Sequence, residues 1–155
     1  MTEDARFEDA GGRPLYLGAM DPDDLAVLSA LVQDAVLPAT EIAWRPRERR
    51  LAFLLNRIRR EEGRPRDPVE RVQSVLVIEN ARGVSSQGVP RGDADTVLQI
   101  LNVGFVPGEY GAGHVEVTLA GDGAIRAEVE ALEVTLKDVT RPYAAPSGRM
   151  PHHPE

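Results

Sequence analysis

The chain has 155 residues, no cysteine and a net charge of −7. Its length fits one domain built around one hydrophobic core. The lack of cysteine excludes disulfides, thiolate metal sites and a cysteine nucleophile, and the negative charge disfavours non-specific binding to nucleic acids.

The ends of the chain carry no sign of export or membrane insertion. The first twenty residues lack the basic start and the apolar run of a signal peptide. No apolar stretch approaches the roughly 20 residues that a membrane helix needs. We therefore expect a soluble, cytoplasmic protein with no membrane partner.

The amino-terminal part predicts one helix. Residues 1–14 are polar and indicate a flexible arm, and Leu15–Met20 has the length of a short strand. Asp21 and Pro22 then suit an N-cap and a first helical position. Apolar residues follow at a spacing of 3.6, which predicts a helix over 22–36 that ends before Pro38.

The middle of the chain alternates with period two and predicts short strands joined by turns. The expected strands cover residues 40–45, 49–59, 71–78, 81–87, 97–106, 115–119 and 125–129. The first two strands form one hairpin and the last two form another, around the turn Gly121-Asp122-Gly123.

Two interpretations fit the segment that follows. A β-bulge near Ala131 and Leu132 would keep the apolar side chains of 125–136 on one core. A helix over 128–137 is the alternative, since Glu, Ala and Leu favour helix. Residues 141–155 hold four prolines and predict an extended Pro-rich tail, which leaves residues 15–140 as the single domain.

These elements predict an α+β fold. We expect one N-terminal amphipathic helix packed on a curled, mostly antiparallel sheet, or on a partly closed β-barrel, of six or seven strands. A closed or curled sheet would also leave few exposed edges.

Nine arginines within residues 45–66 make up half of the basic charge of the chain. Guanidinium groups form bidentate hydrogen bonds with phosphates and carboxylates. The candidate binding residues are therefore Arg57, Arg59, Arg45 and Arg50. Such a hairpin, Arg45–Arg60, would suit a phosphate ligand or nucleic acid. Few aromatic residues lie nearby for base stacking, which disfavours nucleic acid. The alternative interpretation is a solvated, ion-paired face, with the acidic strand around Glu128 and Glu130 lying across from the hairpin.

Evidence for catalysis in the sequence is sparse. His114, or the carboxylates of Glu128 and Glu130, could serve a small hydrolase or lyase. No nucleophile motif or phosphate-binding loop accompanies them. His152 and His153 are adjacent in the tail and do not predict a metal site. We therefore assign no catalytic residue, no metal and no cofactor.

The remaining hypothesis is a non-catalytic binding or protein-interaction module. Its surface would be either the arginine hairpin or the Gly-rich loop Pro107–Gly113. The expected partner is a protein or an anionic small molecule. Pairing of two copies through an unpaired sheet edge, as a homodimer, is a further hypothesis.

Four segments carry a resemblance to a known family: DDLAVLSALVQD (Asp23–Asp34), RRLAFLLNRIR (Arg49–Arg59), ERVQS (Glu70–Ser74) and AIRAEVEALEVTLKD (Ala124–Asp138). They resemble a family of small uncharacterised alphaproteobacterial proteins, which is a domain of unknown function. The similarity spans about residues 15–153. The resemblance implies a bacterial, cytoplasmic, single-domain protein of unknown function and transfers no site residue.

Overall fold

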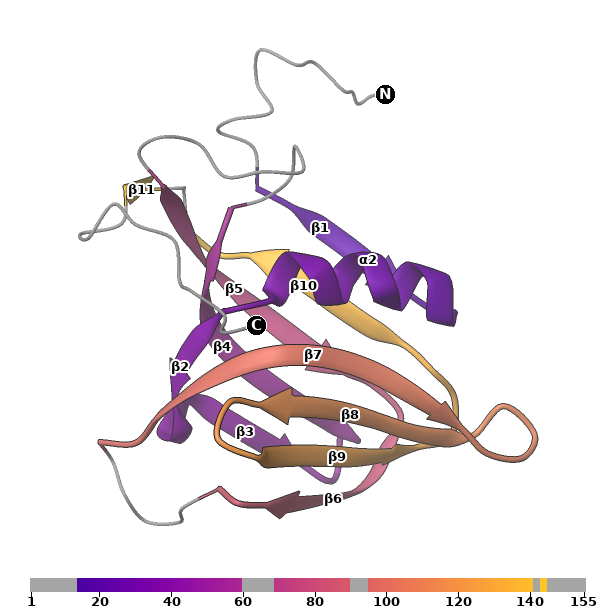
Figure 1. Cartoon of the computed structure of the whole chain (residues 1–155). Coiled ribbons are helices and arrows are strands. Elements are labelled where there is room, and N and C mark those ends of the chain that lie inside the picture. Colours follow the sequence, from indigo (N-terminus) through magenta and orange to yellow (C-terminus); the bar gives the residue numbers. More distant parts are fainter. Residues whose placement is uncertain (1–13, 60–68, 90–94, 141–142, 145–155) are drawn as a thin grey trace, which may run out of the picture.

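The computed structural model describes residues 14–59, 69–89, 95–140 and 143–144. The described part contains one α-helix, one 3-10 helix and eleven strands (Figure 1). In chain order they are β1 (Tyr16–Ala19), α2 (Pro22–Val32), β2 (Val36–Pro38), the 3-10 helix η1 (Ala39–Glu41), β3 (Ile42–Arg45), β4 (Arg50–Ile58), β5 (Glu70–Ile78), β6 (Ala81–Gln87), β7 (Val97–Pro107), β8 (Gly113–Leu119), β9 (Gly123–Val129), β10 (Val134–Asp138) and β11 (Tyr143–Ala144).

All strand pairs in the described residues are antiparallel. The order across the sheet is β1-β10-β5-β4-β2-β7-β8-β9-β6, with β11 beside β5 and β3 beside β4. The short strand β2 joins the two halves of the sheet, because it pairs with β4 on one side and β7 on the other. β1 and β6 are the ends of this order, so the sheet is open.

The predicted α+β fold, with one helix on a sheet or barrel of six or seven strands, is wrong. The structure is mostly sheet, with eleven strands in one open sheet. The sequence pattern missed β2 and β11, because strands of two or three residues hold too few alternations to stand out, and it did not separate β10 from β9.

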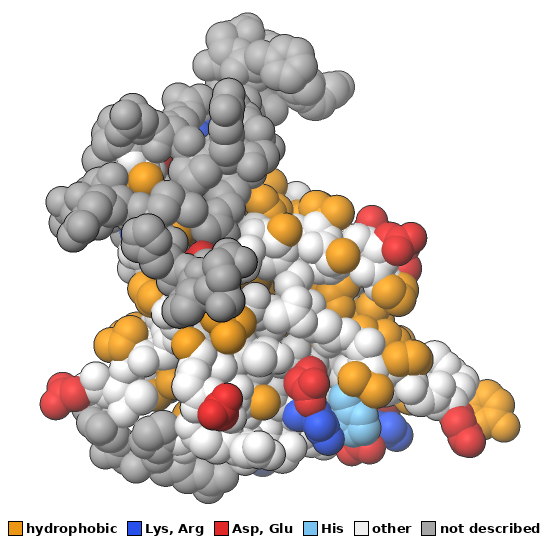
Figure 2. Space-filling model, in the orientation of Figure 1, with side chains coloured by type: hydrophobic (Ala, Val, Ile, Leu, Met, Phe, Trp, Pro, Cys, Tyr) orange, Lys and Arg blue, Asp and Glu red, His pale blue; other side chains and the backbone are white. Residues whose placement is uncertain are grey.

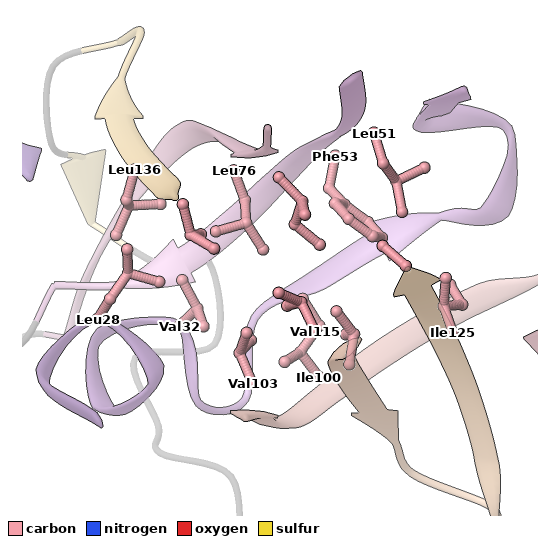
Figure 3. Close-up of a cluster of buried hydrophobic side chains, with 14 of the residues drawn as sticks. Leu28, Val32, Leu51, Phe53, Leu76, Ile100, Val103, Val115, Ile125 and Leu136 are labelled. Carbon is pink, nitrogen blue, oxygen red and sulfur yellow. The ribbon is translucent and has the colours of Figure 1, made fainter. Parts of the chain in front are cut away.

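The core lies where the two halves of the sheet face each other (Figure 3). Leu51 and Phe53 of β4 point toward Ile100 of β7, Val115 of β8 and Ile125 of β9 in this view. All five side chains are buried in one apolar cluster. Burial of such side chains is the main favourable term in folding, and here it holds the two halves together.

Helix α2 closes one end of this core. Leu25, Leu28 and Val32 are buried, and the helix contacts β7, β1 and β4. The predicted N-cap is confirmed, since the carboxylate of Asp21 accepts from the backbone N–H of Asp24 at 2.8 Å.

The helix is four residues shorter than predicted. It ends at Val32, and Asp34 adopts a left-handed backbone with φ of 69°. The backbone N–H of Asp34 donates to the carbonyl of Ile100 at 2.8 Å. With this hydrogen bond the chain leaves the helix and enters β2. The helix therefore ends several residues before Pro38, which was expected to end it.

Neither interpretation of the segment after β9 is correct. β9 ends at Val129 and the chain crosses to the other half of the sheet, where β10 runs between β1 and β5. Leu132 is buried in the connection. The phase change in the apolar pattern therefore marks the end of one strand and the beginning of another.

The predicted division into an arm (1–14), a domain (15–140) and a tail (141–155) stays a prediction. Residues 1–13 and most of 141–155 lie outside the described residues. Within the tail, Tyr143 and Ala144 pair with Arg71 and Glu70 of β5.

Candidate functional site

Arg57, the first candidate binding residue, is fully buried. Its Nη2 donates to Asp138 Oδ1 at 2.9 Å, and its Nε donates to Ser74 Oγ at 3.0 Å. The Ser74 hydroxyl donates to Asp138 Oδ1 at 2.7 Å, and the backbone N–H of Leu15 donates to Asp138 Oδ2 at 2.8 Å. This network links β4, β5 and β10 to the residue that precedes β1, so the charge of Arg57 is used inside the protein.

The other three candidate arginines do not share one surface with Arg57. Arg59 is also buried and forms an ion pair with Glu70 at 3.2 Å. Arg50 is exposed and its Nε donates to Glu79 at 2.9 Å; this hydrogen bond is the main reason why the pKa of Arg50 is raised. Arg45 is exposed and lies opposite Arg50 in the β3–β4 register. Binding by this set stays a prediction, and the burial of two members does not favour it.

The expected pairing of the hairpin with the acidic strand has a counterpart in the structure. Arg49, in the β3–β4 turn, donates to Glu130, directly after β9, at 2.8 Å. Both side chains are about half exposed. Surface pairs of this kind contribute about 0–1 kcal/mol to stability. The contact therefore explains why opposite charges occur in these two segments, but it adds little to the stability of the fold.

The β7–β8 turn, residues 108–112, holds the most exposed aromatic side chain of the described residues. Tyr110 is 100% exposed and has φ of 57°. Two backbone hydrogen bonds close the turn, from Gly108 N–H to the Ala112 carbonyl at 2.7 Å and from Ala112 N–H to the Glu109 carbonyl at 3.0 Å. A left-handed conformation costs a residue with a side chain about 1–2 kcal/mol, so the turn holds Tyr110 in water at a cost.

Gly113 allows this turn to stay close to β7. A Cβ atom at Gly113 would collide with the carbonyl of Val106, and it would lie 2.8 Å from a ring carbon of Phe105. Because only glycine fits here, β8 can approach β7 at its first residue. The base of the turn is therefore fixed by packing as well as by hydrogen bonds.

His114 follows Gly113 and lines a hollow beside the turn. The hollow has a volume of about 660 Å³ and is also lined by Tyr110, Glu128, Glu130 and Arg82. His114 and Glu128 are partners in the β8–β9 register and also line a second, adjoining hollow. Figure 2 shows histidine, basic and acidic side chains side by side in this part of the surface.

The predicted acid–base groups thus lie together, but the carboxylates have other partners. Glu128 is 3.8 Å from Arg82, and Glu130 pairs with Arg49 at 2.8 Å. Glu116, two residues after His114 on β8, pairs with Arg126 at 2.7 Å. A hydrolase or lyase centred on His114, Glu128 or Glu130 stays a prediction, and these ion pairs indicate a charged, solvated face.

A separate groove lies between α2 and β7, with a volume of about 440 Å³. Its helical wall is formed by Pro22, Leu25, Ala26, Ser29, Ala30 and Gln33, and its other wall by Leu101, Asn102, Val103, Gly104 and Phe105. The walls are tied at Ser29, whose Oγ accepts from the backbone N–H of Val103 at 2.9 Å and donates to Asn102 Oδ1 at 3.1 Å.

The groove exists because β7 has two different edges. Val97 to Gln99 pair with β2, whereas residues 102–107 pair only with β8 among the described strands. A β-bulge between Ile100 and Asn102 separates the two parts. Beyond the bulge, β2 no longer pairs with β7, and helix α2 lies along that edge of β7.

Comparison with known proteins gives a family and no more. The family described as "Protein of unknown function (DUF2948)" matches residues 15–153. The chain belongs to this family. The resemblance seen in the sequence is thereby confirmed as to family, and the function of DUF2948 members is not established. No curated protein and no solved structure matches this DUF2948 chain.

No helix among the described residues of this DUF2948 protein is long and apolar enough to cross a membrane. Sequence reasoning selected Pro107–Gly113 as a possible surface because of its glycines, and the structure adds the exposure of Tyr110. It missed the α2–β7 groove, because the two walls are about 70 residues apart in the chain. The sequence holds a weak signal for the groove. Ala26 and Ala30 lie four residues apart, so one side of the predicted helix carries only small side chains.

Proposed function

We propose that this DUF2948 protein is a non-catalytic protein-binding module whose contact surface is centred on the β7–β8 turn. The observation that carries the proposal is Tyr110, which is fully exposed in a left-handed conformation at the tip of a closed turn. Backbone strain of this kind often accompanies functional positions, and tyrosine is among the residues that dominate protein interfaces.

The neighbourhood of Tyr110 supports a protein as the partner. Val106, at the base of the turn, is 51% exposed, and the adjoining hollow offers both acidic and basic side chains. An apolar anchor surrounded by polar groups is the usual arrangement of a protein interface. The hydrogen-bonded turn lowers the entropy that binding would cost, since its backbone is already ordered.

A photo-crosslinking experiment in cells that naturally contain the protein tests this proposal. A photoreactive amino acid replaces Tyr110 in one variant and Tyr16 in the control. Tyr16 is also a highly exposed tyrosine, at 72%, but lies on β1, which is separated from β7 by four strands in the sheet order.

We expect a discrete cross-linked protein from position 110 that position 16 does not give. Mass spectrometry then identifies the partner and the segment that is cross-linked. If neither position gives a discrete product, or both give the same one, the turn is not a specific contact surface and the proposal is wrong.

A further inference from the structure

We infer that the α2–β7 groove receives an amphipathic helix of the partner, with apolar side chains in the groove and basic side chains at the end nearest the β7–β8 turn. This inference rests on the proposed function and specifies the partner's chemistry. It concerns a surface separate from the His114 hollow, since the two share no lining residue.

The shape of the groove favours a helix. Its helical wall runs from Pro22 to Gln33 and is smooth at Ala26 and Ala30, which lie one turn apart on the same side of α2. Small side chains let a second helix approach closely, at the 8–10 Å typical of packed helices. Helices that lie in grooves use apolar residues spaced by three and four as anchors.

The groove and the proposed contact surface are built on neighbouring residues of β7. Gly104 and Phe105 end the strand wall of the groove, and Val106, the next residue on the strand, lines the His114 hollow beside the turn. Figure 2 shows hydrophobic side chains over α2 and over the right-hand part of β7. A partner that contacts Tyr110 can therefore reach the groove along the same strand.

The charges around the groove are acidic and lie at one end. Among the residues that the structure describes, no lysine or arginine lines the groove. Asp21, Asp23 and Asp24 flank Pro22 at the start of α2, and Glu109 lies in the β7–β8 turn beyond Phe105. All four are exposed. Basic side chains at that end of the partner helix would be steered and oriented by these carboxylates.

Binding of three synthetic peptides tests the inference. The first is a basic amphipathic helix of about 15 residues, long enough to form a helix on binding. The second has glutamate in place of each lysine. The third is the first peptide with one central residue replaced by proline, which prevents a helix. Fluorescence anisotropy gives each dissociation constant at low and at moderate salt.

Two protein variants locate the binding. Ala30→Arg places a bulky positive charge in the groove, and Val27→Arg places the same side chain at a 56% exposed position of α2 outside it. Thermal unfolding of both variants checks that the fold is retained. We expect the first peptide alone to bind, Ala30→Arg to weaken it by about tenfold or more, and Val27→Arg to change it by less than about twofold. Salt should weaken this binding.

Several results would overturn the inference. These are equal binding of the acidic or the proline peptide, unchanged affinity of Ala30→Arg, or no binding by any peptide. The cross-linked segment gives an independent check: a partner captured at position 110 through a segment that is not basic and amphipathic leaves the proposed function standing and removes this inference. Absence of any captured partner instead removes the proposed function.

Discussion

At the scale of single residues, the sequence carried a signal that its arginines obscured. Leu51, Phe53 and Leu55 alternate on the buried face of β4, and Arg57 is the next residue on that face. Ser74 continues the buried face of β5 in the same way, and Asp138 that of β10. The alternation alone therefore indicated a buried polar cluster, whereas the local density of arginines suggested a surface.

This cluster leads to a prediction about stability. Asp138→Ala should lower the free energy of unfolding by about 3–5 kcal/mol, because it breaks the buried ion pair with Arg57. Glu130→Ala, which removes the exposed partner of Arg49, should cost less than about 1 kcal/mol. Urea unfolding of both variants measures the two costs. Equal costs would mean that the Arg57–Asp138 pair does not stabilise the fold.

Tyr110 shows the limit of prediction for single residues. The loop was recognisable from its glycines, but positive φ fell on Tyr110 as well as on Gly111. Which residue of a turn adopts this conformation depends on how the flanking strands pair, here Pro107 with Gly113. That pairing is a tertiary property, and no local pattern in the sequence specifies it.

At the scale of elements, predictions were reliable where the side-chain pattern and the turn or cap residues indicated the same structure. The β3–β4 and β8–β9 hairpins form as expected, since each combines alternation with a short turn. The start of α2 was also predicted, from Asp21 and Pro22. Its end was not, because the chain leaves the helix to pair with β7, and that competition is set by distant residues.

The start of α2 gives a prediction at this scale. Asp21→Ala should lower the free energy of unfolding by about 1 kcal/mol, because the N–H of Asp24 loses its acceptor. Asp21→Asn should be close to the original protein, since asparagine caps a helix about as well as aspartate. Thermal or urea unfolding distinguishes them. An equal loss in both variants would assign the effect to the charge of Asp21 rather than to the cap.

At the scale of the whole molecule, the candidate surface arises from elements that the sequence keeps apart. Helix α2 packs on β7, and β2, which follows the helix, pairs with both β4 and β7. The groove and the turn are then both built on the same half of β7, and the β3–β4 hairpin comes close to the turn through the pair of Arg49 and Glu130. Composition and periodicity describe each element, but they do not say which elements become neighbours.

Hydrogen–deuterium exchange of the protein, with and without the partner captured at position 110, tests directly where the partner binds. Binding at the turn and in the groove should slow exchange in α2 and in residues 101–113 and leave the β3–β4 hairpin unchanged. Slower exchange confined to the hairpin around Arg45 and Arg50 would contradict this prediction. It would show that the partner binds the arginine hairpin instead.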